Sequence, residues 1–232
     1  MLTRQGRMHH DIASCSNTTF YAHRLTEVPL EHQLRQLPPA APGTSPLDAL
    51  VSTLRTAFIA VPAPQQQYSD KVNQNEADVI ASLVYHIYLQ YRTTFTPEHT
   101  VGVIVPYRNQ ISTIRNTIAR RYDIPGLADI TIDTVERYQG SQRTCIIYGF
   151  TISHKYQLNF LTGTNFTDTD GHQIDRKLNV AMTRAMEHLY LVGNPRVLAH
   201  NAIYRLLIDT HHHAHTYYQM PVDRFLDGDF KL

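Results

Sequence analysis

Apolar and polar positions follow two different periods along this chain, and each change of period marks a predicted element. Short continuous apolar runs, bounded by proline, glycine or polar residues, predict buried strands at 57–61, 101–105, 130–132, 145–152 and 189–192. Apolar residues at helical spacing predict helices at 75–91, 107–121, 175–185 and 197–208. Strands that alternate with helices at these distances predict βαβ units with right-handed crossovers. The expected fold is a doubly wound α/β domain with a mainly parallel sheet.

The pattern also divides the chain into three parts. Residues 1–50 are irregular: a short helix is predicted at 12–20, and the prolines after it predict an extended segment that lies on a surface or links two bodies. Residues 51–210 carry the regular pattern of a single domain, and 211–232 are expected to be a histidine-rich tail. Within the domain, the polar, threonine-rich stretch 153–171 is expected to be a mobile loop.

Composition narrows the class of protein. The 232 residues carry 21 Lys+Arg against 20 Asp+Glu, and 42% are hydrophobic, which excludes a charged, disordered tail. No apolar run approaches the roughly 18 residues of a membrane span, and no secretory signal is visible. Only Cys15 and Cys145 are present, so we expect no disulfide framework and a reducing cytoplasm. With a net charge of +1, contact with nucleic acid would require a local basic stripe.

The histidine cluster at 211–215 raises the question of a metal site. Imidazoles this close together can bind a transition metal, but no cysteine or carboxylate pattern supports a dedicated site. We therefore expect a solvated helix end and no functional metal.

Candidate chemistry follows from the edges of the predicted sheet. Ligands of open parallel sheets bind at the carboxyl ends of strands. Arginines and hydroxyl or amide donors occur at 106–110, 133–143 and 175–185, and we expect them to gather on one sheet edge. Such groups suit phosphates, because Arg forms bidentate bonds to phosphate oxygens.

The missing motifs are equally informative. The chain contains no G-x-x-x-x-G-K-[ST] loop, no G-x-G-x-x-G after a strand, and no strand that ends in paired acids of the metal-binding kind. The sequence thus offers arginines to a phosphate but no cradle for a triphosphate–magnesium complex. A Rossmann-type cofactor enzyme has little support for the same reason.

Four segments resemble the motifs of superfamily 1B helicases, the family of the nonsense-mediated-decay RNA helicase and the Okazaki-fragment helicase–nuclease. The opening MLTRQGRMHHDIASCSNTTFY is similar to their L-x-x-Q-Y-R-M-H-P-x-I segment. VGVIVPYRNQ resembles motif IV, TIDTVERYQGSQRTCIIYGFT resembles motif V, and DRKLNVAMTRAMEHLYLVGN resembles motif VI. The resemblance covers Leu2 to about Ile208 and implies the second RecA-like domain together with the segment that precedes it.

The resemblance implies catalytic roles for two arginines. Arg184 matches the arginine finger, which reaches the γ-phosphate across the interdomain cleft. By position alone, Arg184 would be a surface side chain paired with Asp175 or Glu187. Arg7 matches the second phosphate-sensing arginine, and its plain alternative is a flexible terminal side chain.

Nucleotide contacts are implied for a second group of residues. Gln139 and Gly140 match the Q-G turn of motif V, and Gln142 stands where the family usually has a Glu that contacts the nucleotide. An amide there can still bind a ribose hydroxyl, so we expect altered nucleotide affinity. Gln110 matches the motif IV Gln and implies a polar contact to nucleotide or to motif VI. Gly6 replaces the family's Tyr.

Nucleic-acid contacts are implied for Pro106, Tyr107 and Thr134. Tyr107 could stack on a base or pack under the following helix, and Thr134 could donate to a phosphate or cap a helical turn. The expectation for Arg176 and Lys177 is an interdomain or phosphate contact, or a solvated helix face. Asn179 is expected to be structural.

Two functions are predicted. The first is the second motor domain of an ATP-dependent helicase acting on single-stranded DNA or RNA, mainly through its backbone. ATP with Mg²⁺ would be held mainly by a first RecA-like domain that this chain lacks, so we expect the chain to be part of a longer protein and inactive alone. The alternative is a non-enzymatic RecA-like module that binds nucleic acid or protein. Oligomeric state stays open, and no membrane partner is expected.

Overall fold

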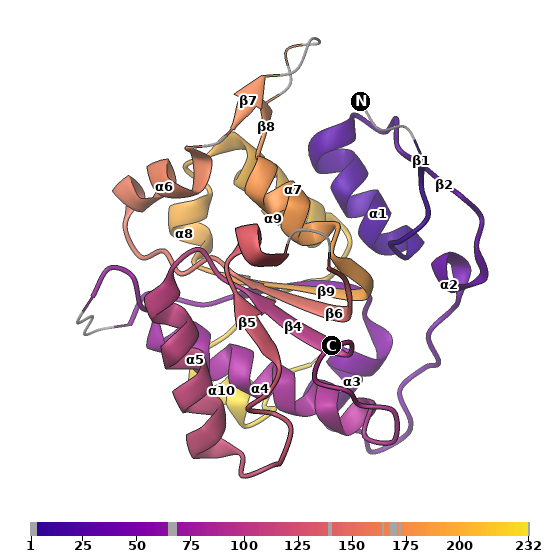
Figure 1. Ribbon diagram of the computed structural model, residues 1–232, viewed down its shortest axis with the longest axis vertical. Helices are drawn as coiled ribbons and strands as arrows, with labels where there is room; N and C mark the ends of the chain where they lie inside the picture. Colours follow the sequence, from indigo (N-terminus) through magenta and orange to yellow (C-terminus); the bar gives the residue numbers. More distant parts are fainter. Residues whose placement is uncertain are drawn as a thin grey trace.

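A six-stranded parallel sheet forms the centre of the molecule. It is seen in a computed structural model that describes residues 4–64, 69–138, 141–163, 165–167, 171 and 173–231 (Figure 1). Its strands are β3 (Thr56–Ala60), β4 (Val101–Ile104), β5 (Thr131–Asp133), β6 (Arg143–Gly149), β9 (Ala185–Gly193) and β10 (Tyr217–Gln219). Their order is β10-β3-β9-β6-β4-β5, and every neighbouring pair is parallel. The predicted doubly wound α/β fold is confirmed.

The continuous apolar runs are explained by burial on both faces of the sheet. In β9, Leu189 and Leu191 belong to one core cluster, whereas Tyr190 and Val192 belong to the other. All four side chains have no exposed surface. Because alternate strand residues point to opposite faces, a strand covered on both sides reads as an unbroken apolar run.

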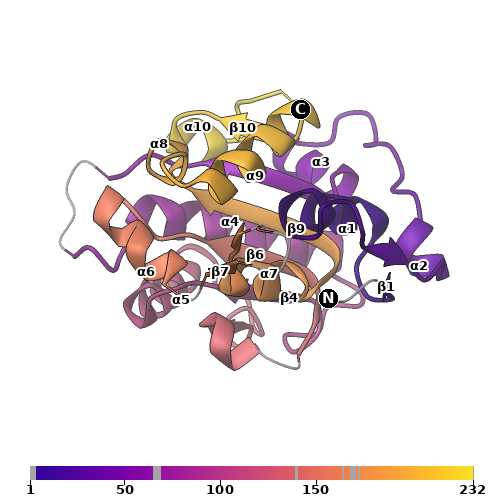
Figure 2. The ribbon, with the colours of Figure 1, turned by 90° about the horizontal axis from the view of Figure 1, so that it is seen from above.

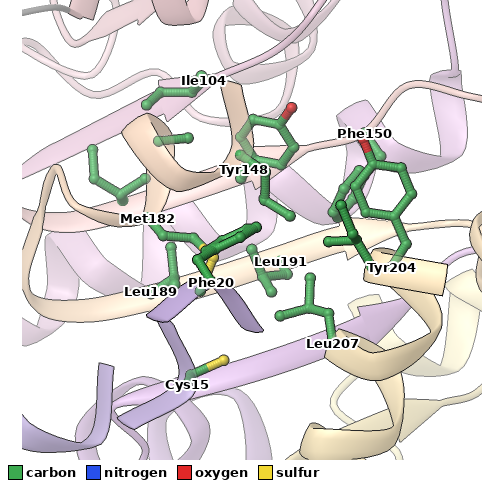
Figure 3. Packing of buried hydrophobic residues seen from close by; sticks show 14 of the residues in the cluster. Cys15, Phe20, Ile104, Tyr148, Phe150, Met182, Leu189, Leu191, Tyr204 and Leu207 are labelled. Carbon is green, nitrogen blue, oxygen red and sulfur yellow. The ribbon is translucent and has the colours of Figure 1, made fainter. Parts of the chain in front are cut away.

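Two helical layers cover these faces. One layer consists of α3 (Pro46–Thr53), α4 (Gln74–Gln90), α5 (Arg108–Arg121) and α10 (Val222–Leu226). The other contains α1 (His10–Ser16), the π-helical turn η1 (Asn17–Tyr21), α7 (Arg176–Met182) and α9 (Ala202–His213). Figure 3 shows Cys15 and Phe20 approaching Leu189 and Leu191 from the α1 side, with Leu207 of α9 beside them.

Side chains placed just before the helices determine where several of them begin. Asn73 accepts from the Glu76 amide at the start of α4, and Asp175 accepts from the Leu178 amide at the start of α7. Asn201 caps α9 in the same way. Each of these oxygens binds a backbone N–H that has no partner inside its helix.

The amino-terminal segment is more closely integrated than a surface segment would be. Met8, Ile12 and Phe20 are at most 3% exposed and pack into the core beside β9. The short parallel pair β1 (Arg4–Gln5) and β2 (Thr26–Glu27) follows the edge of this layer, and α2 (Glu31–Leu34) comes after it. The helix predicted at 12–20 is confirmed, and only the stretch around α2 keeps an extended, exposed course.

The carboxyl-terminal boundary differs from the expectation. Residues 211–232 are not a separate tail, because the boundary falls inside α9 and the segment supplies strand β10, helix α10 and the buried Phe225. His211 is buried and its ring lies 2.8 Å from the Thr56 hydroxyl, whereas the following histidines are exposed. The predicted closing helix is also divided, into α8 (Pro195–Leu198) and α9.

The threonine-rich stretch is partly folded rather than a plain loop. It contains the 3-10 turn η3 (Lys155–Gln157), helix α6 (Leu158–Thr162) and strand β7 (Phe166–Thr167), which pairs with β8 (Gln173–Ile174). Leu158 and Leu161 anchor it in the core. Figures 1 and 2 show α6 and β1 on opposite flanks of the molecule.

Across the described part of the chain, no helix is both long and apolar enough to cross a lipid bilayer.

Candidate functional site

The predicted site residues lie at both ends of the parallel strands and not at one end. We call these two ends the carboxyl edge and the amino edge of the sheet. Pro106 and Thr134 follow the carboxyl ends of β4 and β5. Gln142 and Arg184 directly precede β6 and β9 and therefore lie at their amino ends. The expectation of a single shared edge is wrong, because the segment after β5 crosses the face of the sheet before β6 begins.

The amino edge brings three of the predicted residues together, and we call Arg7, Gln142 and Arg184 the arginine edge. Arg7 Nε donates to Gln142 Oε1 at 2.9 Å, and Arg7 Nη1 donates to the Thr183 carbonyl at 3.0 Å. Arg184 Nη1 lies 3.4 Å from the Ser141 carbonyl. Residues separated by 177 positions in the sequence therefore meet at one point.

The charge of Arg184 is not neutralised. Among the described residues it forms no ion pair, and its buried Nε has no hydrogen-bond partner. Burial lowers the pKa of its guanidinium, and the nearby charge of Arg7 lowers it further. The two carboxylates proposed as ordinary partners are engaged elsewhere: Asp175 caps α7, and Glu187 pairs with Arg55 at 3.1 Å. A half-buried cation beside another cation is an arrangement that an anion would stabilise.

Arg7 is held in place rather than flexible. Gln5 Oε1 accepts from the backbone amides of Arg7 and Met8, at 3.0 and 2.8 Å. The buried Gln33 amide donates to the carbonyls of Gln5 and Met8. A cavity of about 400 Å³ adjoins this segment, with Gly6, Arg7, Tyr21 and Asn179 in its lining. Asn179 bonds the Tyr21 hydroxyl, which agrees with its expected structural role.

Three other predicted nucleotide contacts have different outcomes. Gln139 and Gly140 lie outside the described residues. Gln110 has no exposed surface: its amide donates to the Asn73 carbonyl and its oxygen accepts from the Asn73 amide, both at 2.9 Å. These bonds join the starts of α4 and α5 within the chain, and the nucleotide contact of Gln110 stays a prediction.

The carboxyl edge carries a groove of about 850 Å³. We define the groove by the residues that line it: Asp70, Lys71, Pro106, Tyr107, Arg108, Asn109, Thr134, Glu136, Arg137, Tyr156, Gln157 and Phe160. All three predicted nucleic-acid residues are among them. Thr134 also directly precedes the 3-10 turn η2 (Val135–Tyr138), which suits both of its alternatives. Sequence reasoning missed Tyr156 and Phe160, because they lie in the stretch that was expected to be a loop.

Aromatic rings form one wall of the groove. Tyr107 is 8% exposed and stacks on Phe160 with ring centroids 4.8 Å apart, which favours its packing alternative. The two cations at the start of α7 each approach an aromatic ring: Lys177 lies over Phe160 and Arg176 lies over Phe166. Lys177 also pairs with Glu136 at 3.3 Å. The side chains of Arg176 and Lys177 are therefore both engaged by other side chains of this chain.

Two cations without an ion-pair partner in the described part of the chain also line the groove. Arg108 is exposed, and neither it nor Lys71 has an ion-pair partner among the described residues. Asp70, the nearest carboxylate in the sequence, accepts from the Tyr156 hydroxyl. The groove therefore combines aromatic surface with unpaired positive charge, the combination that single-stranded nucleic acids require.

One buried tyrosine connects the two edges. Tyr138 at the end of η2 is 1% exposed, and its hydroxyl donates to the Thr131 carbonyl at 2.5 Å. It fits only because Gly102 of β4 has no side chain: a methyl group there would overlap the Tyr138 hydroxyl. The guanidinium of Arg143, the first residue of β6, lies over the same ring. The turn η2, which ends at Tyr138, is thus packed against the sheet.

A buried carboxyl group lies in the first turn of α4. Glu76 has no exposed surface and accepts from the Thr151 amide at 2.7 Å and from the Asn73 side chain at 3.3 Å. Burial raises its pKa to about 8. Thr151 has a left-handed backbone with φ +52°, and it leads directly into the segment that carries Tyr156.

Comparison with known proteins shows the family of the chain. The model of the AAA domain family matches residues 1–196. The chain belongs to this family. Its relatives identify it as the C-terminal region of a superfamily 1 helicase, as the motifs predicted.

Three relatives illustrate the likeness. The DNA polymerase alpha-associated DNA helicase A of Saccharomyces cerevisiae is 33% identical over 129 residues, covering 55% of this chain and 16% of that protein. Helicase SEN1 of the same yeast is 26% identical over 90% of this chain and 9% of its own. The DNA-binding protein SMUBP-2 of Mesocricetus auratus is 25% identical over 90% of this chain and 19% of its own. This helicase-family chain thus spans less than a fifth of each relative.

A solved structure, the C-terminal domain of a possible DNA helicase from Lactobacillus plantarum, also aligns. The alignment covers 93% of this chain and 98% of that one, with a TM-score of 0.47 and 11% sequence identity.

Proposed function

We propose that this chain is the second motor domain of an ATP-dependent helicase or translocase. The observation that carries the proposal is the meeting of Arg7 and Arg184 at one edge with no carboxylate paired to Arg184. Two cations held in this way require an anion from outside the chain, and a nucleotide phosphate fits that requirement.

Arg184 would act as the arginine finger. A guanidinium directed at the γ-phosphate neutralises charge on the transferring group, and its half-buried position strengthens the interaction relative to water. Arg7 would bind a second phosphate oxygen, and its bond to Gln142 would set the direction of its guanidinium. Gln142, an amide where the family usually has Glu, would bind a ribose hydroxyl without adding negative charge.

ATP would lie between this chain and a first RecA-like domain. That domain would supply the phosphate loop and the carboxylates that hold Mg²⁺, since the arginine edge offers amides and guanidiniums. When bound, the Mg²⁺ ion would neutralise charge on the phosphates. Closure of the two domains would bring Arg184 to the phosphate, and reopening would follow hydrolysis.

The groove would hold the single strand. Arg108 and Lys71 would meet its phosphates, which makes affinity dependent on salt. Tyr138 and η2, packed between groove and arginine edge, offer a physical route by which strand binding and nucleotide binding affect each other.

The second candidate is a non-enzymatic module that binds nucleic acid. One observation favours it: the groove is complete within the chain, whereas the arginine edge needs another domain to form a catalytic site. Both candidates predict strand binding, but only the motor predicts ATP hydrolysis.

Measuring ATP turnover distinguishes the two. We expect negligible turnover by the 232 residues alone, and turnover once the chain is joined to a domain with a phosphate loop, in one polypeptide or as two proteins. Arg184→Ala should then lower kcat by about a thousandfold or more. Arg120→Ala, which removes an exposed arginine at the far end of α5, is the matched control and should leave kcat unchanged. Turnover that survives Arg184→Ala would refute the motor assignment.

A further inference from the structure

Tyr156 is the most exposed large hydrophobic side chain of the groove, at 58%, yet its ring is fixed in direction. Its hydroxyl donates to the Asp70 carboxylate, and its ring is nearly parallel to that of His154, with an interplanar angle of 8° and centroids 5.6 Å apart. No other ring and no cation lies over Tyr156 among the described residues. One flat aromatic surface therefore stays open toward the groove.

The segment beneath Tyr156 is rigid. Gln157 is 4% exposed, and its oxygen accepts from the amides of Ser153 and His154, both at 2.8 Å. Its side-chain amide donates to the Asp70 carbonyl, which joins this segment to the other rim of the groove. Holding a ring in place before a ligand arrives lowers the conformational entropy lost on binding.

Phe160 lies one helical turn further along, and Tyr107 and Lys177 cover the two faces of its ring, so it forms part of the wall without offering a second open face. It is 47% exposed, and its ring rests on Tyr107. The unpaired cations Arg108 and Lys71 line the same groove. An anionic chain that passes these cations can turn its bases toward the aromatic wall, whereas a ligand without flat rings gains nothing from that wall.

We propose that Tyr156 is a base-stacking platform that holds a single-stranded nucleic acid through one of its bases. This proposal rests on the assignment of the groove to a single strand. It goes beyond that assignment, because the motifs implied contacts mainly to the backbone. Bases of either DNA or RNA present the same flat surface, so the platform accepts both.

The test is strand affinity measured by fluorescence anisotropy on the 232-residue chain. The probes are oligothymidylate, oligouridylate and an abasic deoxyribose-phosphate strand of the same length. We expect Tyr156→Ala to raise Kd for both base-carrying strands about tenfold. Tyr156→Phe keeps the ring but loses the bond to Asp70, and it should stay within about threefold of the wild type.

The abasic strand distinguishes stacking from a general loss of structure. If Tyr156 stacks on a base, Tyr156→Ala changes the Kd for the abasic strand little, because that strand has no base to lose. Equal losses on abasic and base-carrying strands would overturn the platform, and so would no loss on either.

Failure of the proposed function would look different. If Arg108→Glu weakens all three strands while Tyr156→Ala weakens none, the groove still binds a strand and only the platform is refuted. If the wild-type chain binds none of the three strands at low salt, both the groove assignment and the platform are refuted.

Discussion

The arginine edge and the groove lie at opposite ends of the parallel sheet, and they differ in how their charges are paired. At the arginine edge, Arg7 and Arg184 bind carbonyl and amide oxygens but no carboxylate, and the pKa of Arg184 is lowered by burial and by its neighbour. In the groove, Lys177 pairs with Glu136 and Tyr156 bonds Asp70. The carboxylates of the groove are thus engaged within the chain while Arg108 and Lys71 have no ion-pair partner among the described residues, whereas the arginine edge has cations and no described carboxylate.

The difference indicates what each region still needs. Unneutralised charge in a half-buried site favours a ligand that supplies the opposite charge, so under the proposed function the arginine edge would bind a phosphate held by another domain. Under the proposed function the groove would need only a strand, because aromatic surface and cations without ion-pair partners among the described residues both line it. The chain would then hold part of a catalytic site at one end of its strands and a strand-binding groove at the other.

The largest predicted effect is a loss of stability when the packing of Tyr138, between the arginine edge and the groove, is disturbed. In Gly102→Ala the new methyl group would overlap the Tyr138 hydroxyl and lie 3.0 Å from Arg143 Cγ. We expect a loss of about 3 kcal/mol in the free energy of unfolding, measured with urea. Gly6→Ala is the control, since its nearest contact would be an ordinary 3.5 Å. Adding Tyr138→Phe to Gly102→Ala should restore part of the loss; a Gly102→Ala protein as stable as the wild type would contradict the packing argument.

A smaller effect is predicted for the affinity for a single strand, which should depend on the groove and not on the arginine edge. Arg108→Glu reverses a cation of the groove, and we expect it to raise Kd for a single strand about tenfold at low salt and to reduce the salt dependence. Arg184→Ala should leave this Kd within about twofold, because Arg184 lies at the other edge. Arg120→Glu makes the same charge change at the far end of α5 and serves as the control. Equal effects from Arg108→Glu and Arg120→Glu would indicate general charge attraction only.

The smallest predicted effect is a change of stability with pH that comes from the buried carboxyl group of Glu76. Burial raises the pKa of Glu76 to about 8, from an ordinary value near 4.5. The folded protein therefore keeps this proton to higher pH than the unfolded chain does. The resulting stability is complete below pH 4.5 and is lost as the pH rises through about 8. Between pH 7 and 8 we expect the free energy of unfolding to fall by about 1 kcal/mol.

Two substitutions isolate that carboxyl group in urea unfolding at each pH. Glu76→Gln removes the ionisable group. The free energy of unfolding of this variant should therefore fall less steeply with pH than that of the wild type, whatever its value at any one pH. Glu31→Gln, which changes a carboxylate that is 93% exposed, should keep the wild-type slope. A wild-type slope in Glu76→Gln would assign the pH dependence to other groups.

The sequence predicted the central strands well and the elements at the periphery of the fold less well. Five predicted strands are found within a few residues of their predicted positions, because an apolar run buried on both faces is visible locally. Strand β10 was missed, because Tyr217–Gln219 is short and half polar and pairs with β3 only through tertiary contacts. The stretch around α6 was missed because Leu158 and Leu161 are too few to form a periodic pattern.

For the site, the motifs selected residues but not their arrangement. Arg7 and Arg184 were named from sequence, and the structure brings them together. Gln110 was named too, yet its polar atoms are engaged by Asn73. Tyr156 could not be found by periodicity, because a single exposed aromatic residue in a polar stretch carries no signal until the groove around it is seen.

The sequence by itself determined the fold class, the order of strands and helices along the chain, and the helicase motifs, because these depend on local spacing and residue type. Tertiary structure alone decided which edge of the sheet each motif occupies and which arginine remains without a counter-charge. It also turned the histidine-rich end into an edge strand and a short helix that buries Phe225. Those outcomes depend on contacts between residues more than a hundred positions apart, and no local pattern encodes them.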